Sequence, residues 1–167
     1  MMTIVHQLAV AVAPWADFYN NSAVAQSAVA FGHFGGMMTA GGLALSADRS
    51  TLRALRGESW EHRRQLKELS AIHPLVVGAL AVTAASGLLM FAADLEALSG
   101  SAMFWVKMAL VALLLFNGWM MVRAERQLER GHPSEGRLWQ QLRRASLVSL
   151  GLWFAVVLAG AILPNVV

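Results

Sequence analysis

Four long runs of apolar residues, separated by short polar segments, dominate the pattern of the chain. They cover roughly residues 23–47, 72–93, 102–122 and 145–163. A helix needs about 20 apolar residues to cross the ~30 Å hydrocarbon core of a bilayer, and each run reaches about that length. The pattern therefore predicts an all-α integral membrane protein, a four-transmembrane-helix bundle that forms one domain over residues 1–167.

A shorter apolar run, residues 1–16, precedes the first span and is closed by Pro14 and the polar residues that follow. No basic segment stands ahead of it, which argues against a secretory signal peptide. Trp15 and Tyr19 are side chains typical of the headgroup level. We therefore expect a short N-terminal interfacial helix that does not span the membrane.

The basic residues predict the orientation of the bundle. Of the 13 Lys and Arg residues, six lie between the first and second spans, six lie between the third and fourth, and the last is Lys107. Acidic residues lie at the opposite ends of the spans, namely Asp17, Asp94 and Glu96. By the positive-inside rule, the loops 48–71 and 123–144 are cytoplasmic and both termini lie outside.

Both basic loops are expected to be helical in part. Leucines recur there at helical spacing, at Leu52, Leu55, Leu66 and Leu69. Gly57 should divide the first loop into two pieces. The third helix should run on into the cytoplasm and stop at the Gly131-His132-Pro133-Ser134 turn, with Ser134 capping the fourth helix.

Composition narrows the functional classes. The 167 residues are 57% hydrophobic and only 14% charged, with a mean hydropathy of +0.53, which excludes a water-soluble globule. The chain has no cysteine, so disulfides, thiolate metal sites and cysteine nucleophiles are excluded. The net charge of +3 is explained by the basic loops, so the expected partners are the bilayer and a membrane protein or a second copy, not nucleic acid.

Small residues recur at four-residue spacing in the first span, at Gly32, Gly36 and Ala40. Such spacing lets helix backbones approach closely in lipid. The alternative is that these glycines make room for a flat cofactor beside the first span.

Few ionisable residues lie inside the spans, and such residues are the default functional candidates in a membrane protein. His33 falls near the bilayer midplane, either as a neutral histidine bonded to a carbonyl or to Asn117, or as a ligand or proton-transfer group. Lys107 either extends to the outer headgroups or points inward to hold an anion such as a porphyrin carboxylate.

His73 directly precedes Pro74, which suits the first position of a helix and predicts that His73 caps the second span. His33 and His73 are both candidate metal ligands. Counted from opposite faces of the bilayer, however, their heights differ by roughly 10 to 14 Å. We therefore expect either one axial histidine or two separate sites.

Most of the methionines lie in spans, and thioethers suit copper(I). A copper site would combine His33 with Met37, Met38 and Met108. Methionine is also an ordinary apolar filler of helix interfaces, which is the simpler reading.

Three motifs carry a family resemblance: His33 followed by Gly41-Gly42, Ser86-Gly87-Leu88-Leu89 in a proline-led second span, and Phe104-Trp105-Val106-Lys107-Met108 at the start of the third. They resemble a broad group of small bacterial four-helix membrane proteins that includes the copper-resistance D domain and the J-type protoporphyrinogen oxidase. The resemblance implies that His33 and Lys107 occupy positions that the oxidase branch associates with haem b binding and porphyrinogen oxidation. Asn117 stands near a position where that branch is expected to carry a histidine.

The sequence thus favours a redox protein of the bacterial cytoplasmic membrane that binds a haem b-like cofactor. His33 would be an axial ligand, Lys107 an anchor for a propionate or substrate, and His73 and Asn117 further cofactor-binding residues. As an enzyme it would be a membrane-bound oxidoreductase acting on a porphyrinogen or quinol. The alternatives are a copper transport or resistance component and a non-catalytic subunit of a larger membrane complex.

Overall fold

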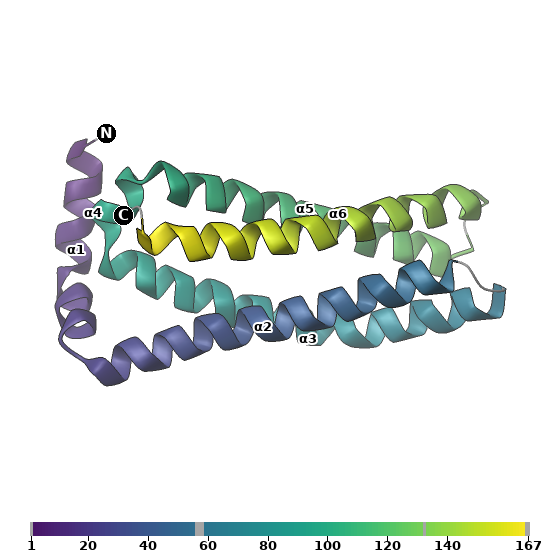
Figure 1. The fold of residues 1–167 in the computed structure, drawn as a ribbon, viewed down its shortest axis with the longest axis horizontal. Helices are drawn as coiled ribbons and strands as arrows, with labels where there is room; N and C mark the ends of the chain where they lie inside the picture. Colours follow the sequence, from purple (N-terminus) through teal and green to yellow (C-terminus); the bar gives the residue numbers. More distant parts are fainter. Residues whose placement is uncertain (1, 56–58, 132, 166–167) are drawn as a thin grey trace.

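The computed structural model describes residues 2–55, 59–131 and 133–165, and over these ranges the chain is almost entirely helical. No strand occurs in this part of the chain. The elements are α1 (Met2–Asn20), α2 (Ala23–Ala54), α3 (Ser59–Ala93), α4 (Leu95–Gly100), α5 (Ala102–Glu129), α6 (Glu135–Ile162) and a final 3-10 turn, η1 (Leu163–Asn165) (Figure 1).

Four of these helices, α2, α3, α5 and α6, are long and apolar enough to cross a bilayer. They form two antiparallel hairpins, α2 with α3 and α5 with α6, and α2 packs against α6 to join them (Figure 1). The connections α2–α3 and α5–α6 share one end of the bundle, here called the loop end. The N-terminal helix α1, the short helix α4 and the final turn η1 share the other, the terminal end. The predicted four-helix membrane bundle is confirmed.

The surface of the bundle is apolar, as a lipid environment requires. Large hydrophobic side chains point outward on every long helix; Phe31, for example, is 80% exposed, and Leu88 and Phe154 are also exposed. Polar side chains are buried instead, including Asp48 and Glu125. This distribution is the reverse of that in a soluble domain, and contact with lipid accounts for it.

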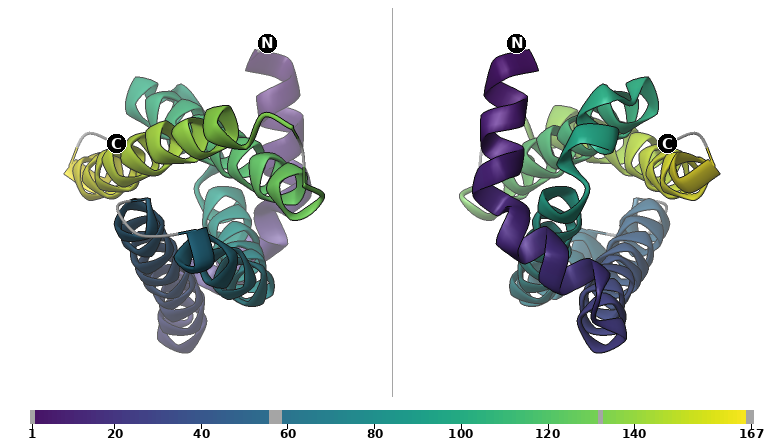
Figure 2. Two further views of the ribbon diagram at one scale, coloured as in Figure 1. Left: turned by 90° about the vertical axis from the view of Figure 1, so that its right-hand side faces the viewer. Right: turned by 90° about the vertical axis from the view of Figure 1, so that its left-hand side faces the viewer.

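Helix α1 crosses the terminal end of the bundle, as expected of an interfacial helix (Figure 2). It does not stop at Pro14, however, but continues to Asn20. The turns after the proline are held to the bundle because Trp15 Nε1 donates a hydrogen bond to the Leu89 carbonyl over 2.9 Å. The predicted end of the interfacial segment at residue 16 is therefore too early.

The long helices extend beyond the apolar runs at the loop end. With 35 residues, α3 is about 52 Å long, well above the ~30 Å hydrocarbon core. The prediction of helical loops is confirmed by the far ends of α2 and α5. Helix α5 ends at Glu129 with Arg130 as its C-cap residue, and Gly131 follows with a φ of +67° that only glycine adopts freely. Ser134 is the N-cap residue of α6. Gly57 and His132 lie outside the described residues.

The prediction that His73 caps the second span is wrong, because α3 runs through Pro74 without a break. Proline removes one backbone hydrogen bond, but the segment before it is anchored by tertiary packing. Gln65 Nε2 donates to Thr51 Oγ1 of α2 over 3.1 Å, and Leu69 is buried. These contacts keep the residues before Pro74 helical.

Glycines set the spacing of the helices at two positions. A Cβ atom on Gly36 would lie 2.5 Å from Thr83 Oγ1 and 2.8 Å from the Ala79 carbonyl oxygen of α3. On Gly41 it would lie 3.3 Å from the indole of Trp153 in α6. The space beside these two glycines is thus filled by neighbouring helices, which supports the packing interpretation over that of a cofactor beside them.

Candidate functional site

His33 of α2 is half-buried and faces α3. Its Nδ1 lies 3.0 Å from the Thr83 carbonyl oxygen and 3.4 Å from Ser86 Oγ. Because a carbonyl can only accept a hydrogen bond, Nδ1 carries the proton and Nε2 keeps a lone pair. The ring lies against Gly87, where a Cβ atom would approach His33 Cε1 to 3.1 Å. His33 therefore has the carbonyl partner expected of a satisfied histidine, together with a second nitrogen that can act as a ligand.

Lys107 of α5 points into the bundle, the second of its two expected orientations. Its Cε and Nζ atoms lie 3.7 Å from the position of a Cβ on Gly160 of α6, so the side chain packs across that glycine. Its charge also acts on the imidazole of His33. Among the described residues no carboxylate pairs with Lys107. His33, Thr83 and Ser86 form a polar site in the terminal half of the bundle, here called the His33 site. Lys107 is counted with this site because its charge acts on the imidazole.

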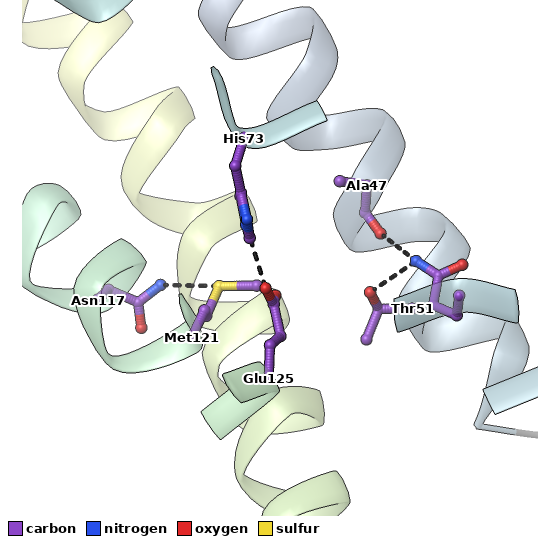
Figure 3. A network of polar contacts seen from close by, with 7 residues as sticks. Ala47, Thr51, His73, Asn117, Met121 and Glu125 are labelled. Carbon is purple, nitrogen blue, oxygen red and sulfur yellow. Dashed lines mark hydrogen bonds and ion pairs between the residues drawn. The ribbon is translucent and has the colours of Figure 1, made fainter. Parts of the chain in front are cut away.

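His73 belongs to a different level of the bundle. Its Nε2 forms an ion pair with Glu125 Oε2 of α5 over 3.1 Å (Figure 3). His33 meets α3 at Thr83, ten residues further along than His73, which is about 15 Å along the helix axis. The two histidines therefore do not share a site. In the described part of the chain, no three His, Asp or Glu side chains are grouped as a metal site would require.

Asn117 also lies away from His33. Its Nδ2 donates to the Ala145 carbonyl of α6 over 3.0 Å and lies 3.8 Å from Met121 Sδ (Figure 3). Of the predicted cofactor-binding residues, Lys107 is the one whose charge acts on His33, whereas His73 and Asn117 lie toward the loop end.

The residues around His73 form a second polar site that the sequence interpretation missed. Buried or half-buried polar side chains of all four long helices lie in this region, and several are joined in pairs across helices, such as Gln65 with Thr51 and His73 with Glu125. We call them the loop-end cluster: Asp48, Thr51, Gln65, His73, Asn117, Glu125, Ser146 and Ser149. Three of their oxygens are buried without a hydrogen-bond partner, namely Asp48 Oδ2, Glu125 Oε1 and Ser146 Oγ. Buried polar atoms are rarely left in this state, so the cluster needs a functional explanation.

A sequence signal for this cluster exists. Asp48 follows Gly41 by seven residues, which places it on the same inward face of α2 two turns later. Glu125 follows Met121 by four residues and Asn117 by eight, again on one face of α5. Both carboxylates lie just beyond the predicted apolar runs, in segments predicted to be cytoplasmic loops.

Met37 and Met38 of the copper alternative lie in different surroundings. Met37 packs against the apolar cluster in the middle of the bundle, which contains Ala40 and Trp153. The adjacent Met38 is exposed on the outer surface. Successive residues of a helix point in directions about 100° apart, so the two thioethers face different surroundings.

Comparisons of the chain with protein-family models, curated proteins and solved structures found no significant match. The assignment of a function therefore depends on the chain's own residues.

Proposed function

We propose that this protein is a membrane redox protein in which His33 would hold a haem b-like cofactor. The observation that carries the proposal is the hydrogen bond of His33 Nδ1 to the Thr83 carbonyl, which leaves Nε2 available. Metal-ligating histidines typically donate their other ring nitrogen to a carbonyl or carboxylate, which fixes the tautomer and the ring orientation.

The other residues of the His33 site suit such a group. Lys107 supplies a cation, without a carboxylate partner in the described chain, that would hold a propionate. Gly87 lets the imidazole approach α3 closely, because a Cβ atom there would lie 3.1 Å from His33 Cε1. When bound, a haem supplies one-electron redox chemistry, while the chain orients the ligand and keeps the site in an apolar surrounding.

The arrangement also supports the family resemblance to which the sequence points. Its three motifs come from different helices: His33 of α2 contacts Ser86 and Gly87 of α3, and the charge of Lys107 of α5 acts on His33. On this basis we propose a porphyrinogen or a quinol as the class of electron donor. Either would reach the site from the lipid phase.

We further propose that the protein lies in the bacterial cytoplasmic membrane with its loop end in the cytoplasm and both termini outside. Support comes from the shared position of the two basic connections at the loop end. Under the positive-inside rule that end stays on the cytoplasmic side.

The test is a visible spectrum of the protein purified in mild detergent, oxidised and dithionite-reduced, with metal analysis of the same sample. We expect a Soret band that shifts on reduction, about one iron per chain, and loss of both in His33→Ala. His73→Ala is the matched control, since it removes an equally half-buried histidine, and should keep the spectrum.

A colourless, iron-free wild-type protein would overturn the proposal, as would a His33→Ala variant with an unchanged spectrum. Bound copper in place of iron would indicate the transport alternative. A metal-free protein that copurifies with a membrane partner would indicate a structural subunit.

A further inference from the structure

The loop-end cluster lies at a defined height in the bundle. Asp48, His73, Glu125 and Ser146 each lie within three residues of the loop-side end of an apolar run, although they come from four different helices. The cluster is therefore inside the bundle at the level where the helices leave the hydrocarbon core. Water outside the bundle is close by, while the carboxyl groups themselves are shielded from it.

Two carboxyl groups share this interior with one imidazole. Asp48 is 2% exposed and Glu125 is 5% exposed, and the two are close enough to repel each other when both are charged. Glu125 pairs with His73, but in the described chain neither acid pairs with an arginine or lysine. Two carboxylates and one imidazolium leave a net buried charge of −1, which is costly in an apolar bundle unless a further cation neutralises it.

The neighbouring groups do not supply that cation. Arg126 and Glu129 act on the cluster from α5, but both are exposed and opposite in sign. The hydroxyls of Ser146 and Ser149 on α6 lie beside Asp48 but leave its Oδ2 without a donor, and on the α2–α3 side Gln65 donates its amide to Thr51. The unpartnered oxygens of Asp48 and Glu125 are acceptors that lack a donor. A proton on either carboxyl would supply a donor and remove the excess charge.

Within the loop-end cluster, solvent exposure falls from His73 to Glu125, which suits the entry of a proton from the loop-end solution through His73. The side chain of His73 is 34% exposed, whereas that of Glu125, its ion-pair partner, is 6% exposed. An imidazole can accept a proton at Nδ1 and release one from Nε2. His73 Nε2 faces Glu125 Oε2, so a proton that leaves the nitrogen forms an O–H bond on the carboxyl as the N–H bond breaks.

We propose that Asp48 and Glu125 form a shared interior site that binds one proton reversibly, with His73 as the group through which it exchanges with the loop-end solution. The proposal does not depend on a cofactor at His33. It gives the bundle a second functional site, about 15 Å from His33 along α3, suited to a process that takes up or releases protons.

Infrared spectroscopy of the full-length protein in lipid nanodiscs tests this. A protonated carboxyl has a C=O stretch that carboxylates lack. We expect this band in the wild-type protein at neutral pH, with a shift in deuterium oxide. It should be lost in Glu125→Gln and in Asp48→Asn, because each variant removes one of the two carboxylates whose mutual repulsion favours the bound proton. Glu129→Gln removes an exposed acid one turn further along α5 and should keep the band.

Isotope labelling of Asp or Glu carboxyls in the wild-type protein assigns the band even if a variant fails to fold.

A second measurement follows the band after a pH jump, and His73→Gln should slow the exchange of the bound proton with the solution at least tenfold. The proposal is overturned if the wild-type band is absent or if it survives in both acid variants. It is also overturned if sodium removes the band at constant pH, since the site would then hold a metal cation. Equal exchange rates with and without His73 would refute the entry route. None of these outcomes depends on the visible spectrum that tests the haem proposal.

Discussion

Replacing Gly36 by alanine should separate α2 from α3 and destabilise the bundle. The added methyl carbon would lie 2.5 Å from Thr83 Oγ1, 2.8 Å from the Ala79 carbonyl oxygen and 3.1 Å from the Thr83 nitrogen. Two of these atoms belong to the backbone of α3 and cannot rotate away. The third, Thr83 Oγ1, is held by its own hydrogen bond to the Ala79 carbonyl over 2.9 Å. The helices must therefore move apart to accommodate the new group.

The cost follows from the size of that movement. Non-bonded carbon contacts are optimal at about 3.5–4.0 Å, so the backbones must separate by roughly 1 Å at this level. Inserting a methyl group into a tight interface costs about 1–3 kcal/mol. Because α2 and α3 form the most extensive helix pair and lipid supplies no hydrophobic drive, we expect the upper part of that range.

Gly35 is the matched control, because a Cβ atom there meets no atom within 4 Å. Gly35→Ala should match the wild-type protein or exceed its stability slightly, since alanine favours the helix by up to about 1 kcal/mol over glycine. The measurement is the free energy of unfolding in mixed micelles with increasing denaturing detergent, followed by circular dichroism. In Gly36→Ala/Thr83→Ala the Ala79 carbonyl still blocks the methyl group, so only part of the stability should return. Equal stability of Gly36→Ala and Gly35→Ala would refute the reasoning.

Two further predictions concern the loop-end core and the orientation of the bundle. Leu142 is 0% exposed and packs among Ala124, Leu128 and Trp139, so Leu142→Ala should lower the free energy of unfolding by about 2–5 kcal/mol in the same assay. Leu147→Ala changes an exposed site on the same helix and should lower it far less. Similar losses of stability in the two variants would contradict the core assignment. Because the chain has no cysteine, Ala97→Cys and Glu135→Cys place single thiols at the terminal end and the loop end. A membrane-impermeant thiol reagent should label only the first in intact cells, and labelling of only the second would reverse the proposed orientation.

The fold was predictable because the requirement for crossing a bilayer is local. Each long helix needs a sufficient run of apolar residues, and that run is visible in the sequence without knowledge of its neighbours. The stop at Gly131 was predictable for a similar reason, since a left-handed backbone position strongly favours glycine. Helix α5 accordingly ends just before Gly131, and α6 begins just after Ser134.

Local signals failed where contacts between helices decide the outcome. In the sequence Pro74 indicates the start of a helix, but the Gln65–Thr51 hydrogen bond and the buried Leu69 keep the preceding residues helical. At Pro14, likewise, the bond from Trp15 to the Leu89 carbonyl holds the continuing helix against α3. In both cases tertiary contacts offset the single backbone hydrogen bond that a proline removes.

For the candidate sites, too, local sequence signals identified some residues, and contacts between helices decided their partners. The sequence alone determined that His33 and Lys107 are polar groups inside apolar helices, because their immediate neighbours are apolar. Only the tertiary structure decided that His33 bonds to Thr83, that Lys107 turns inward, and that His73 pairs with Glu125 instead of joining His33. It also decided that Asp48 and Glu125 are buried together. Helical periodicity assigns a residue to a face, but the partner across that face comes from another helix whose rotation and height depend on packing along the whole bundle.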